Sequence, residues 1–279
     1  MPNVRPAAVA GSFYPAEAGE LKDVLQECFE SHPLGPRGAR SPAPSLLGGI
    51  APHAGYTYSG PCAAHLYSRL DPNTRRVVIL GVNHRGRGAR AALSPADFWE
   101  TPLGRARVDR ELGERLLEQV DFLTEDERPH REEHSIEVEL AFLQSVLGEF
   151  AFLPVSLSRI SQDECRRLAR ALAGLCAAGG GEKIFLLASS DLSHYLPPEE
   201  NDRLDRLALE KILALDAPGL LATVAENHIT MCGAIPAAVL LFAAHALGAG
   251  KATLLRHCHS GDAAPAREVV GYASVAVEF

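Results

Sequence analysis

Leu46-Leu47-Gly48-Gly49-Ile50-Ala51-Pro52-His53-Ala54-Gly55-Tyr56-Thr57-Tyr58 is the stretch of this chain that most clearly indicates its fold. A short apolar run bounded by Gly and Pro predicts a buried strand that opens into a loop. In an open α/β sheet, ligands bind outside the carboxyl ends of the strands. His53 therefore stands where such a fold places functional groups. A loop histidine is more often a hydrogen-bonded turn residue, so the prediction depends on whether the pattern recurs.

The pattern recurs twice along the chain. The apolar run 77–82 is followed by Asn83 and His84, and the run 183–188 opens into a segment that contains Asp191 and His194. Near-continuous apolar strands of this kind are typical of parallel sheets that are covered on both faces. Three separate strands are thus predicted to end in polar groups at one edge of the sheet.

Helical patterns separate these strands. They cover residues 16–31, 59–70, 110–119, 134–144, 161–178, 199–215, 217–227 and 231–247, and further strands are expected at 150–157, 251–256 and 268–278. Ser161 and Glu164 have the spacing of a capping box at a helix start. Because strands and helices alternate and neither a repeat nor a linker divides the chain, we predict an α/β fold. It would be a single three-layer α/β/α domain over residues 1–279 with a central mixed sheet.

Composition excludes several classes of function. The 279 residues carry 27 Lys and Arg against 35 Asp and Glu, a formal charge of −8, without a basic patch, so nucleic acid is not an expected partner. The longest apolar stretch, 234–248, is shorter than the roughly 18 residues of a membrane span. The first residues lack a signal pattern, and six Cys without regular spacing indicate no disulfide framework. We therefore expect a cytoplasmic protein with no membrane partner.

Two predicted helix starts add further polar groups, His134 and Cys232. Strand ends and helix starts at one edge of a sheet face the same crevice, so these groups are expected to converge with His53 and His84. Two imidazoles and a thiolate are suitable ligands for Zn, Cu or Fe. A cysteine at a helix start is also favoured as thiolate by the helix dipole.

Each residue also has a purely structural interpretation. Cys232 could be a small buried residue. His134 could cap a helix and pair with Glu133 or Glu137, and Asp191 could be the N-cap of a turn. These alternatives remain open at this point, although their joint occurrence at one predicted edge favours a site.

A second cluster, His257-Cys258-His259, also contains ligand types, but it lies between the terminal strands without an obvious fourth group. The remaining cysteines fall on the apolar faces of predicted helices and are expected in the core; they are Cys28, Cys62, Cys165 and Cys176. Neither a phosphate-binding glycine loop nor a Gly-x-Ser-x-Gly elbow occurs.

These motifs, taken in order, resemble the Memo family. The matching segments span nearly the whole chain: Arg5 with Val9–Pro15, Ala51–Tyr56 with Ser59-Gly60, Gly81–His84, Thr101–Gly104, Glu133–Glu137, Ser189–His194, Cys232-Gly233 and Val270–Ala273. The family is in turn similar to the class III extradiol dioxygenases, which share an α/β/α fold and hold a non-haem iron through two His and a carboxylate.

The resemblance implies roles for individual residues. His53, His84 and Cys232 stand at the three metal-ligand positions, and His134, Asp191 and His194 would line the same pocket as catalytic groups. Cys232 replaces the carboxylate of the dioxygenases. A thiolate is a softer ligand, so iron or copper is the expected cofactor and zinc is a further candidate.

Two functional interpretations follow from the resemblance. The first is a metal-dependent redox enzyme acting on a small molecule that remains to be identified. The second is a non-catalytic metal-handling protein, or an adaptor that binds peptides or proteins through the same pocket, since family members have been described as binding phosphotyrosine peptides. Arg131 is the nearest candidate for a phosphate contact, without a surrounding Arg cluster. In prokaryotes the family often accompanies a radical-SAM protein, which is therefore an expected pathway partner. The sequence leaves the oligomeric state open.

Overall fold

Four apolar runs of the sequence form the centre of the sheet. In the computed structural model, which describes residues 2–178 and 183–279, these runs are β2 (Leu46–Ala51), β3 (Arg76–Val82), β8 (Ala151–Leu157) and β9 (Ile184–Ser189). They are parallel and lie side by side in the order β8-β3-β9-β2. Their carboxyl ends therefore meet at one edge of the sheet, as the sequence predicts.

Further strands, some of them short and some of them antiparallel to their neighbours, extend this centre on both sides into a mixed sheet. Beyond β8 lie β6 (Gly104–Val108), β5 (Phe98–Thr101), β1 (Val4–Arg5), β4 (Ala91–Leu93) and β7 (Thr124–Glu125). Beyond β2 lies the long antiparallel β12 (Val269–Glu278), which pairs with β11 (Lys251–His259) and β10 (His194–Leu196).

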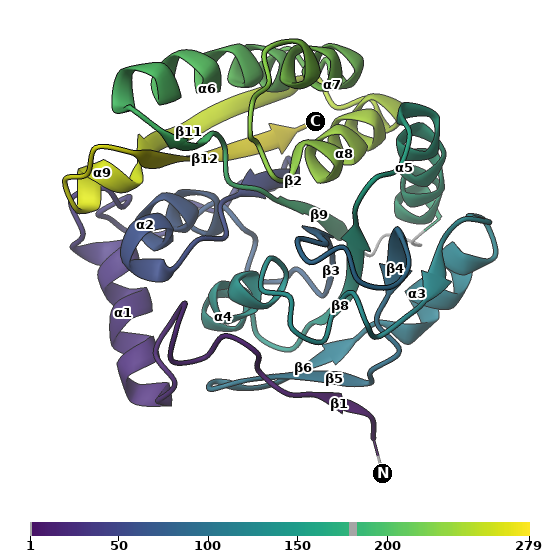
Figure 1. The fold of residues 1–279 in the computed structure, drawn as a ribbon. Coiled ribbons are helices and arrows are strands. Elements are labelled where there is room, and N and C mark those ends of the chain that lie inside the picture. Colours follow the sequence, from purple (N-terminus) through teal and green to yellow (C-terminus); the bar gives the residue numbers. More distant parts are fainter. Residues whose placement is uncertain (1, 179–182) are drawn as a thin grey trace.

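Helices cover both faces of the sheet (Figure 1). One face carries α1 (Ala18–Glu30), α2 (Tyr56–Tyr67) and α4 (Glu137–Val146). The other carries α3 (Arg110–Leu117), α5 (Gln162–Ala177), α6 (Pro198–Leu213), α7 (Ala217–Glu226) and α8 (Ala234–Leu247), and the short α9 (Ser260–Ala263) packs on β12.

The strands divide their side chains between two hydrophobic cores. In β3, Val77 and Ile79 pack into the core under α2 and α4, whereas Val78 and Leu80 pack into the core under α5 and α8. This alternation follows from the two-residue period of a strand. The predicted three-layer α/β/α architecture is confirmed.

Some helix starts differ from the sequence prediction. The capping box of Ser161 and Glu164 at α5 is present. Helix α2, however, begins at Tyr56 instead of Ser59, because the amides of Tyr58 and Ser59 already bond to the Gly55 carbonyl. Helices α4 and α8 begin later than predicted, at Glu137 and Ala234, so His134 and Cys232 lie in the turns that precede them.

All six cysteines are free thiols, as predicted. Four of them are buried or half-buried on helices, on α1, α2 and twice on α5. Among the described residues, no helix combines the length and apolar character that crossing a membrane requires.

Candidate metal centre

Three potential ligands meet at the carboxyl edge of the central strands. His53 lies two residues after β2, His84 two residues after β3, and Cys232 two residues before α8. One ligand atom of each lies within 4.8 Å of the others, and His53 Nε2 is 3.2 Å from Cys232 Sγ. Zinc and its neighbours bind nitrogen and sulfur at roughly 2.0–2.3 Å, so atoms this close can share one ion. The convergence expected for these three side chains is present.

The imidazole of His53 is oriented by Ser189, the last residue of β9. Its Nδ1 lies 2.7 Å from Ser189 Oγ, and that hydroxyl also lies 2.6 Å from the backbone carbonyl of Ser135. A carbonyl can only accept, so the hydroxyl hydrogen belongs to that contact and His53 Nδ1–H donates to Ser189. Nε2 is then free to face Cys232. Burial, together with nearby imidazoles, lowers the pKa of His53, which keeps the ring neutral.

The imidazole of His84 is oriented by a carboxylate. Its Nδ1 lies 2.8 Å from Glu133 Oε1, and its backbone N–H donates to Glu133 Oε2 at 2.9 Å. Burial alone would raise the pKa of Glu133. The hydrogen bond from His84, the charges of His84 and His134 and a backbone amide outweigh burial and lower this pKa to about 2. Glu133 is therefore ionised, and it fixes His84 with Nε2 free.

His134 lies beside this pair. Its ring stacks on His84 with centroids 4.6 Å apart and planes at 12°, and its Nδ1 is 3.2 Å from Glu133 Oε1. Burial lowers the pKa of His134 to about 4. The ring is thus neutral near pH 7.

Cys232 departs from one expectation. A thiolate favoured by the helix dipole was predicted, yet burial and the neighbouring Asp191 raise the pKa of the Cys232 thiol. Ionisation of this thiol near pH 7 would therefore require a positive charge beside it, such as that of a metal ion. The turn is tight: a Cβ on Gly233 would lie 2.3 Å from Ser190 Cβ, so a glycine is required next to the cysteine.

Asp191 and His194 hold the surrounding backbone. Asp191 Oδ1 accepts the His53 backbone N–H at 2.7 Å, and burial raises the pKa of Asp191 to about 6. His194 is half-buried and donates from Nδ1 to the Thr230 carbonyl at 3.0 Å. The tautomer of His194 is thus fixed by a backbone carbonyl. His194 acts electrostatically on His53 and Asp191 without joining the ligand cluster.

A second set of close donors, His84, Glu133 and His134, overlaps with the first. The His84 Nδ1 contact with Glu133 Oε1 at 2.8 Å is a hydrogen bond, and His134 Nδ1 lies 3.2 Å from the same oxygen, so the carboxylate lies between the two rings. This set therefore explains how the rings are oriented rather than where a second ion would sit.

The competing cluster His257-Cys258-His259 does not converge. Successive side chains of a strand point to opposite faces, so Cys258 packs with Cys62 and Tyr272 while His257 pairs with Asp205 at 3.1 Å. His259 pairs with Asp262 at 3.6 Å. The three side chains thus reach three separate partners.

The sequence interpretation missed residues that support the ligands. It named Glu133 only as a partner for His134, and it gave no role to Ser189 or Glu139. A signal existed: Glu137 and Glu139 lie within the otherwise apolar run that forms α4, and both are buried. Acidic residues in a helix that is apolar all round require specific partners.

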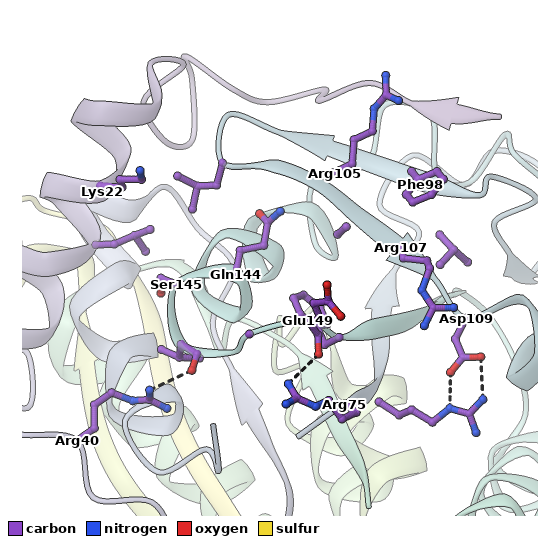
Figure 2. Close-up of a pocket in the computed structure, with 18 of the residues that line it drawn as sticks. Lys22, Arg40, Arg75, Phe98, Arg105, Arg107, Asp109, Gln144, Ser145 and Glu149 are labelled. Carbon is purple, nitrogen blue, oxygen red and sulfur yellow. Dashed lines mark hydrogen bonds and ion pairs between the residues drawn. The ribbon is translucent and has the colours of Figure 1, made fainter. Parts of the chain in front are cut away.

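A large cavity lies elsewhere. A cavity of about 1830 Å³ lies at the amino ends of β3 and β8, the edge opposite to the histidines. Figure 2 shows residues that line it. Arginines line it, but several are engaged by the protein: Arg75 donates to the Glu149 carbonyl, Arg40 to the Val146 carbonyl, and Arg76 pairs with Asp109. This cavity is separate from the candidate metal centre.

Comparison with known proteins covers almost the whole chain. A family model described as "Memo-like protein" matches residues 5–276. The chain is 41% identical over 279 residues to a MEMO1 family protein of Pyrobaculum aerophilum, covering 98% of both chains. It is 40% identical over 279 residues to one of Desulfurococcus amylolyticus, covering 97% of this chain and 98% of the relative. It is 39% identical over 277 residues to one of Methanosarcina barkeri, covering 99% and 100%.

Proposed function

Because this chain belongs to the Memo family, we propose that it is a metal-dependent redox enzyme related to the extradiol dioxygenases. His53, His84 and Cys232 would hold a non-haem metal ion. One observation carries the proposal: three donor atoms from three elements lie within 4.8 Å of one another. The hydrogen bonds of both imidazoles support it, because each Nδ1 is engaged and each Nε2 is left for a ligand bond.

The donor set fits a first-row transition metal. Two neutral imidazoles suit iron, copper and zinc, and a thiolate adds softness that selects against magnesium or calcium. Iron or copper is our first assignment because either would supply redox chemistry, whereas zinc would supply Lewis acidity alone.

The remaining site residues have different tasks in this proposal. His134 is neutral and its Nδ1 lies against Glu133, so its other nitrogen can accept a proton from a bound hydroxyl group. His194, fixed by Thr230, is the second candidate acid–base group. Asp191 is assigned a positioning role, because its carboxylate accepts the backbone N–H of His53.

The alternative is a protein that handles metal, or binds peptides or proteins, without turnover. Both functions would use the same pocket, so they differ in turnover and not in ligation. A small-molecule substrate and a radical-SAM pathway partner belong to the enzymatic proposal, and both come from the family resemblance. Six free thiols support placing the protein in a reducing, cytoplasmic compartment.

Metal analysis tests ligation. Protein purified without added metal should contain iron, copper or zinc, and Cys232→Ser should lose most of it, because a hydroxyl is a far poorer ligand than a thiolate. Cys176→Ser is the matched control, since Cys176 is a half-buried thiol on α5 outside the ligand cluster. Equal metal content in Cys232→Ser and the control would refute Cys232 as a ligand.

Oxygen consumption with catechols as first substrates tests turnover. His134→Ala and His194→Ala should keep their metal and lose activity by about 10²–10⁴-fold, the usual contribution of positioned proton transfer. Metal-loaded protein that consumes no oxygen with any substrate tried would favour the metal-handling alternative.

A further inference from the structure

Glu139 is a buried acid that the proposed function leaves without a task. It lies in the first turns of α4 and is 1% exposed. Its two oxygens have one short contact each: Oε2 accepts from the Tyr67 hydroxyl at 2.5 Å, and Oε1 lies 2.7 Å from Ser189 Oγ. Ser189 is the residue that orients His53, so Glu139 is linked to the candidate metal centre through a single hydroxyl group.

Counting hydrogens across these contacts gives the protonation state of Glu139. Four contacts need one hydrogen each: Tyr67 to Glu139, Glu139 to Ser189, Ser189 to the Ser135 carbonyl, and His53 to Ser189. Tyrosine, serine and the His53 Nδ1–H supply three. The fourth must be carried by the carboxyl group of Glu139.

An ionised Glu139 would leave one contact without a hydrogen. The serine hydroxyl would point either at the carboxylate, leaving the Ser135 carbonyl 2.6 Å from a bare oxygen, or at that carbonyl, leaving the carboxylate bare at 2.7 Å. Both arrangements place two oxygen lone pairs against each other in a buried site, where an unsatisfied acceptor is costly. With the acid protonated, Ser189 Oγ accepts twice and donates once, which uses its full capacity.

The charges around Glu139 agree with this count. The titratable groups that act on it from neighbouring elements are Tyr67 and Tyr56 of α2 and Asp191 after β9, and none is a cation. Burial is the largest influence and raises the pKa of Glu139 to about 8. Glu137 lies two residues earlier and is equally buried, but its partners differ. It pairs with Arg5 and accepts hydrogen bonds from the backbone amides of Ala8 and Val9.

We propose that Glu139 is held as a neutral carboxylic acid and that, through Ser189, it positions His53 with its proton on Nδ1 and its lone pair on Nε2. Glu139 is a positioning residue in this scheme, since it touches neither ligand nor substrate. Its significance for metal ligation rests on the proposed function, but its protonation state and the His53 tautomer do not. Both can therefore be measured in protein stripped of metal.

Infrared spectroscopy tests the protonation state. At neutral pH, the protein stripped of metal should show the carbonyl stretch of a protonated carboxylic acid, and this band should vanish in Glu139→Gln and persist in Glu137→Gln. The amide replaces the acid with the same shape and still offers a donor to Ser189, so the fold should survive. Carboxyl ¹³C NMR of the wild-type chain gives the same assignment without a variant. A deprotonated signal for Glu139 at neutral pH in that experiment would overturn the proposal.

Imidazole ¹⁵N NMR tests the action through Ser189. His53 should be the Nδ1–H tautomer in the wild type and in Glu139→Gln, and a mixture of tautomers in Ser189→Ala. Raising the pH above about 8 should move the His53 signals in the wild type and leave them fixed in Glu139→Gln. A wild type and a Glu139→Gln variant with the same pH profile would remove Glu139 from the chain of contacts. A protein that never binds metal would defeat the proposed function and leave these outcomes unchanged.

Zn²⁺ titration then tests whether the contacts from Glu139 through Ser189 to His53 affect metal binding. Ser189→Ala should weaken Zn²⁺ binding about 10- to 100-fold, the usual effect of losing a partner that orients a ligand, and Glu139→Gln should bind close to wild type. If Glu139→Gln weakened binding as much as Ser189→Ala, the acid proton would have a role that an amide cannot replace, and the positioning scheme would be wrong.

Discussion

His53 and His84 follow two strands of the same sheet and face the same point, but different chemistry holds them. His53 is 1% exposed, and its Nδ1 donates to a serine hydroxyl that is backed by Glu139. The His84 side chain is 29% exposed, and its Nδ1 donates directly to the carboxylate of Glu133. The Nδ1–H of His53 therefore donates to an uncharged hydroxyl group, whereas the Nδ1–H of His84 donates to a negatively charged carboxylate.

The two glutamates have pKa values on opposite sides of the ordinary value. Both are buried, and burial raises the pKa of each. For Glu133, the hydrogen bonds from His84 and a backbone amide and two nearby imidazoles outweigh burial, and the pKa falls to about 2. For Glu139, the hydrogen bonds with Tyr67 and Ser189 do not outweigh burial, and the pKa rises to about 8. Partners, and not burial alone, decide the charge of a buried acid.

This difference has a consequence for the metal ligands. A carboxylate on Nδ1 raises the basicity of an imidazole and strengthens its ligand bond, whereas a hydroxyl group does so less. In the proposed centre His84 would be the stronger donor and His53 the weaker one. Three predictions, in order of expected size, test whether the two histidines are held in these different ways.

The largest effect concerns the stability of the wild type relative to Glu139→Gln as the pH rises. The folded protein keeps a proton on Glu139 up to about pH 8, whereas the unfolded chain releases it near the ordinary value of 4.5. The native state therefore binds more protons between these values, and stability must fall as the pH rises through this window. The total loss is at most roughly 5 kcal/mol.

Urea unfolding of both proteins at several pH values from 5 to 8 measures this loss. The difference in unfolding free energy between the two proteins gives the contribution of Glu139 alone. Other groups cancel in this difference, such as His130 and His134, whose lowered pKa values make stability rise with pH below about 6.5. Parallel profiles for the wild type and Glu139→Gln would show that Glu139 is ionised in the folded protein and would end the comparison.

The fold and the positions of the candidate ligands were predictable because they depend on local patterns. Apolar runs bounded by Gly and Pro predict the central strands, and the carboxyl ends of parallel strands must share an edge. His53 and His84 follow from that rule alone. The predicted helix start placed Cys232 at the same edge, but a cysteine before an apolar helix is also suited to a core, so the family resemblance was needed to decide between the two interpretations.

The support of the ligands was not predictable because it is non-local. Ser189 contacts His53 and Glu139 across 136 and 50 residues of sequence, and Glu133 contacts His84 across 49. The state of Cys232 was also missed, since the helix-dipole argument ignores how deeply the thiol is buried. The spacing of residues in a sequence shows neither how deeply one side chain is buried nor which partner offsets the effect of burial on its pKa.

The second prediction concerns the other side of the comparison. Glu133→Gln should lose at most roughly 3 kcal/mol of stability at neutral pH, since the native pKa of about 2 lies below the ordinary 4.5 and charged imidazoles cause part of this difference. The sign is opposite to that of Glu139: the stabilisation is full above about pH 4.5 and disappears as the pH falls toward 2. Metal affinity should also fall about 10- to 100-fold, because His84 loses its orienting carboxylate.

Glu132→Gln is the control for this variant. Glu132 is the preceding residue, but its side chain is 48% exposed and pairs with Arg85 and Arg87 at the surface. Such a pair contributes about 0–1 kcal/mol. Chemical unfolding and Zn²⁺ titration of both variants give the two readouts. Equal behaviour of Glu132→Gln and Glu133→Gln would mean that the His84 contact has no special importance.

The smallest effect concerns Tyr67→Phe. The Tyr67 hydroxyl donates to Glu139, and burial raises the pKa of Tyr67, so the phenol keeps its proton in alkaline solution. A hydrogen bond to a neutral acceptor contributes about 0.5–1.5 kcal/mol, and one to a charged acceptor about 1.5–3 kcal/mol. The cost of Tyr67→Phe should therefore be small at pH 7 and roughly double at about pH 9, where Glu139 has lost its proton. Tyr14→Phe is the matched variant, because Tyr14 donates at the same distance of 2.5 Å to Glu137, the carboxyl group that pairs with the Arg5 guanidinium. Its cost should be of the charged kind at both pH values. Unfolding free energies of the two variants at the two pH values test this prediction. A pH-independent cost for Tyr67→Phe would mean that Glu139 does not change charge across this interval, whatever the spectra of the wild type show.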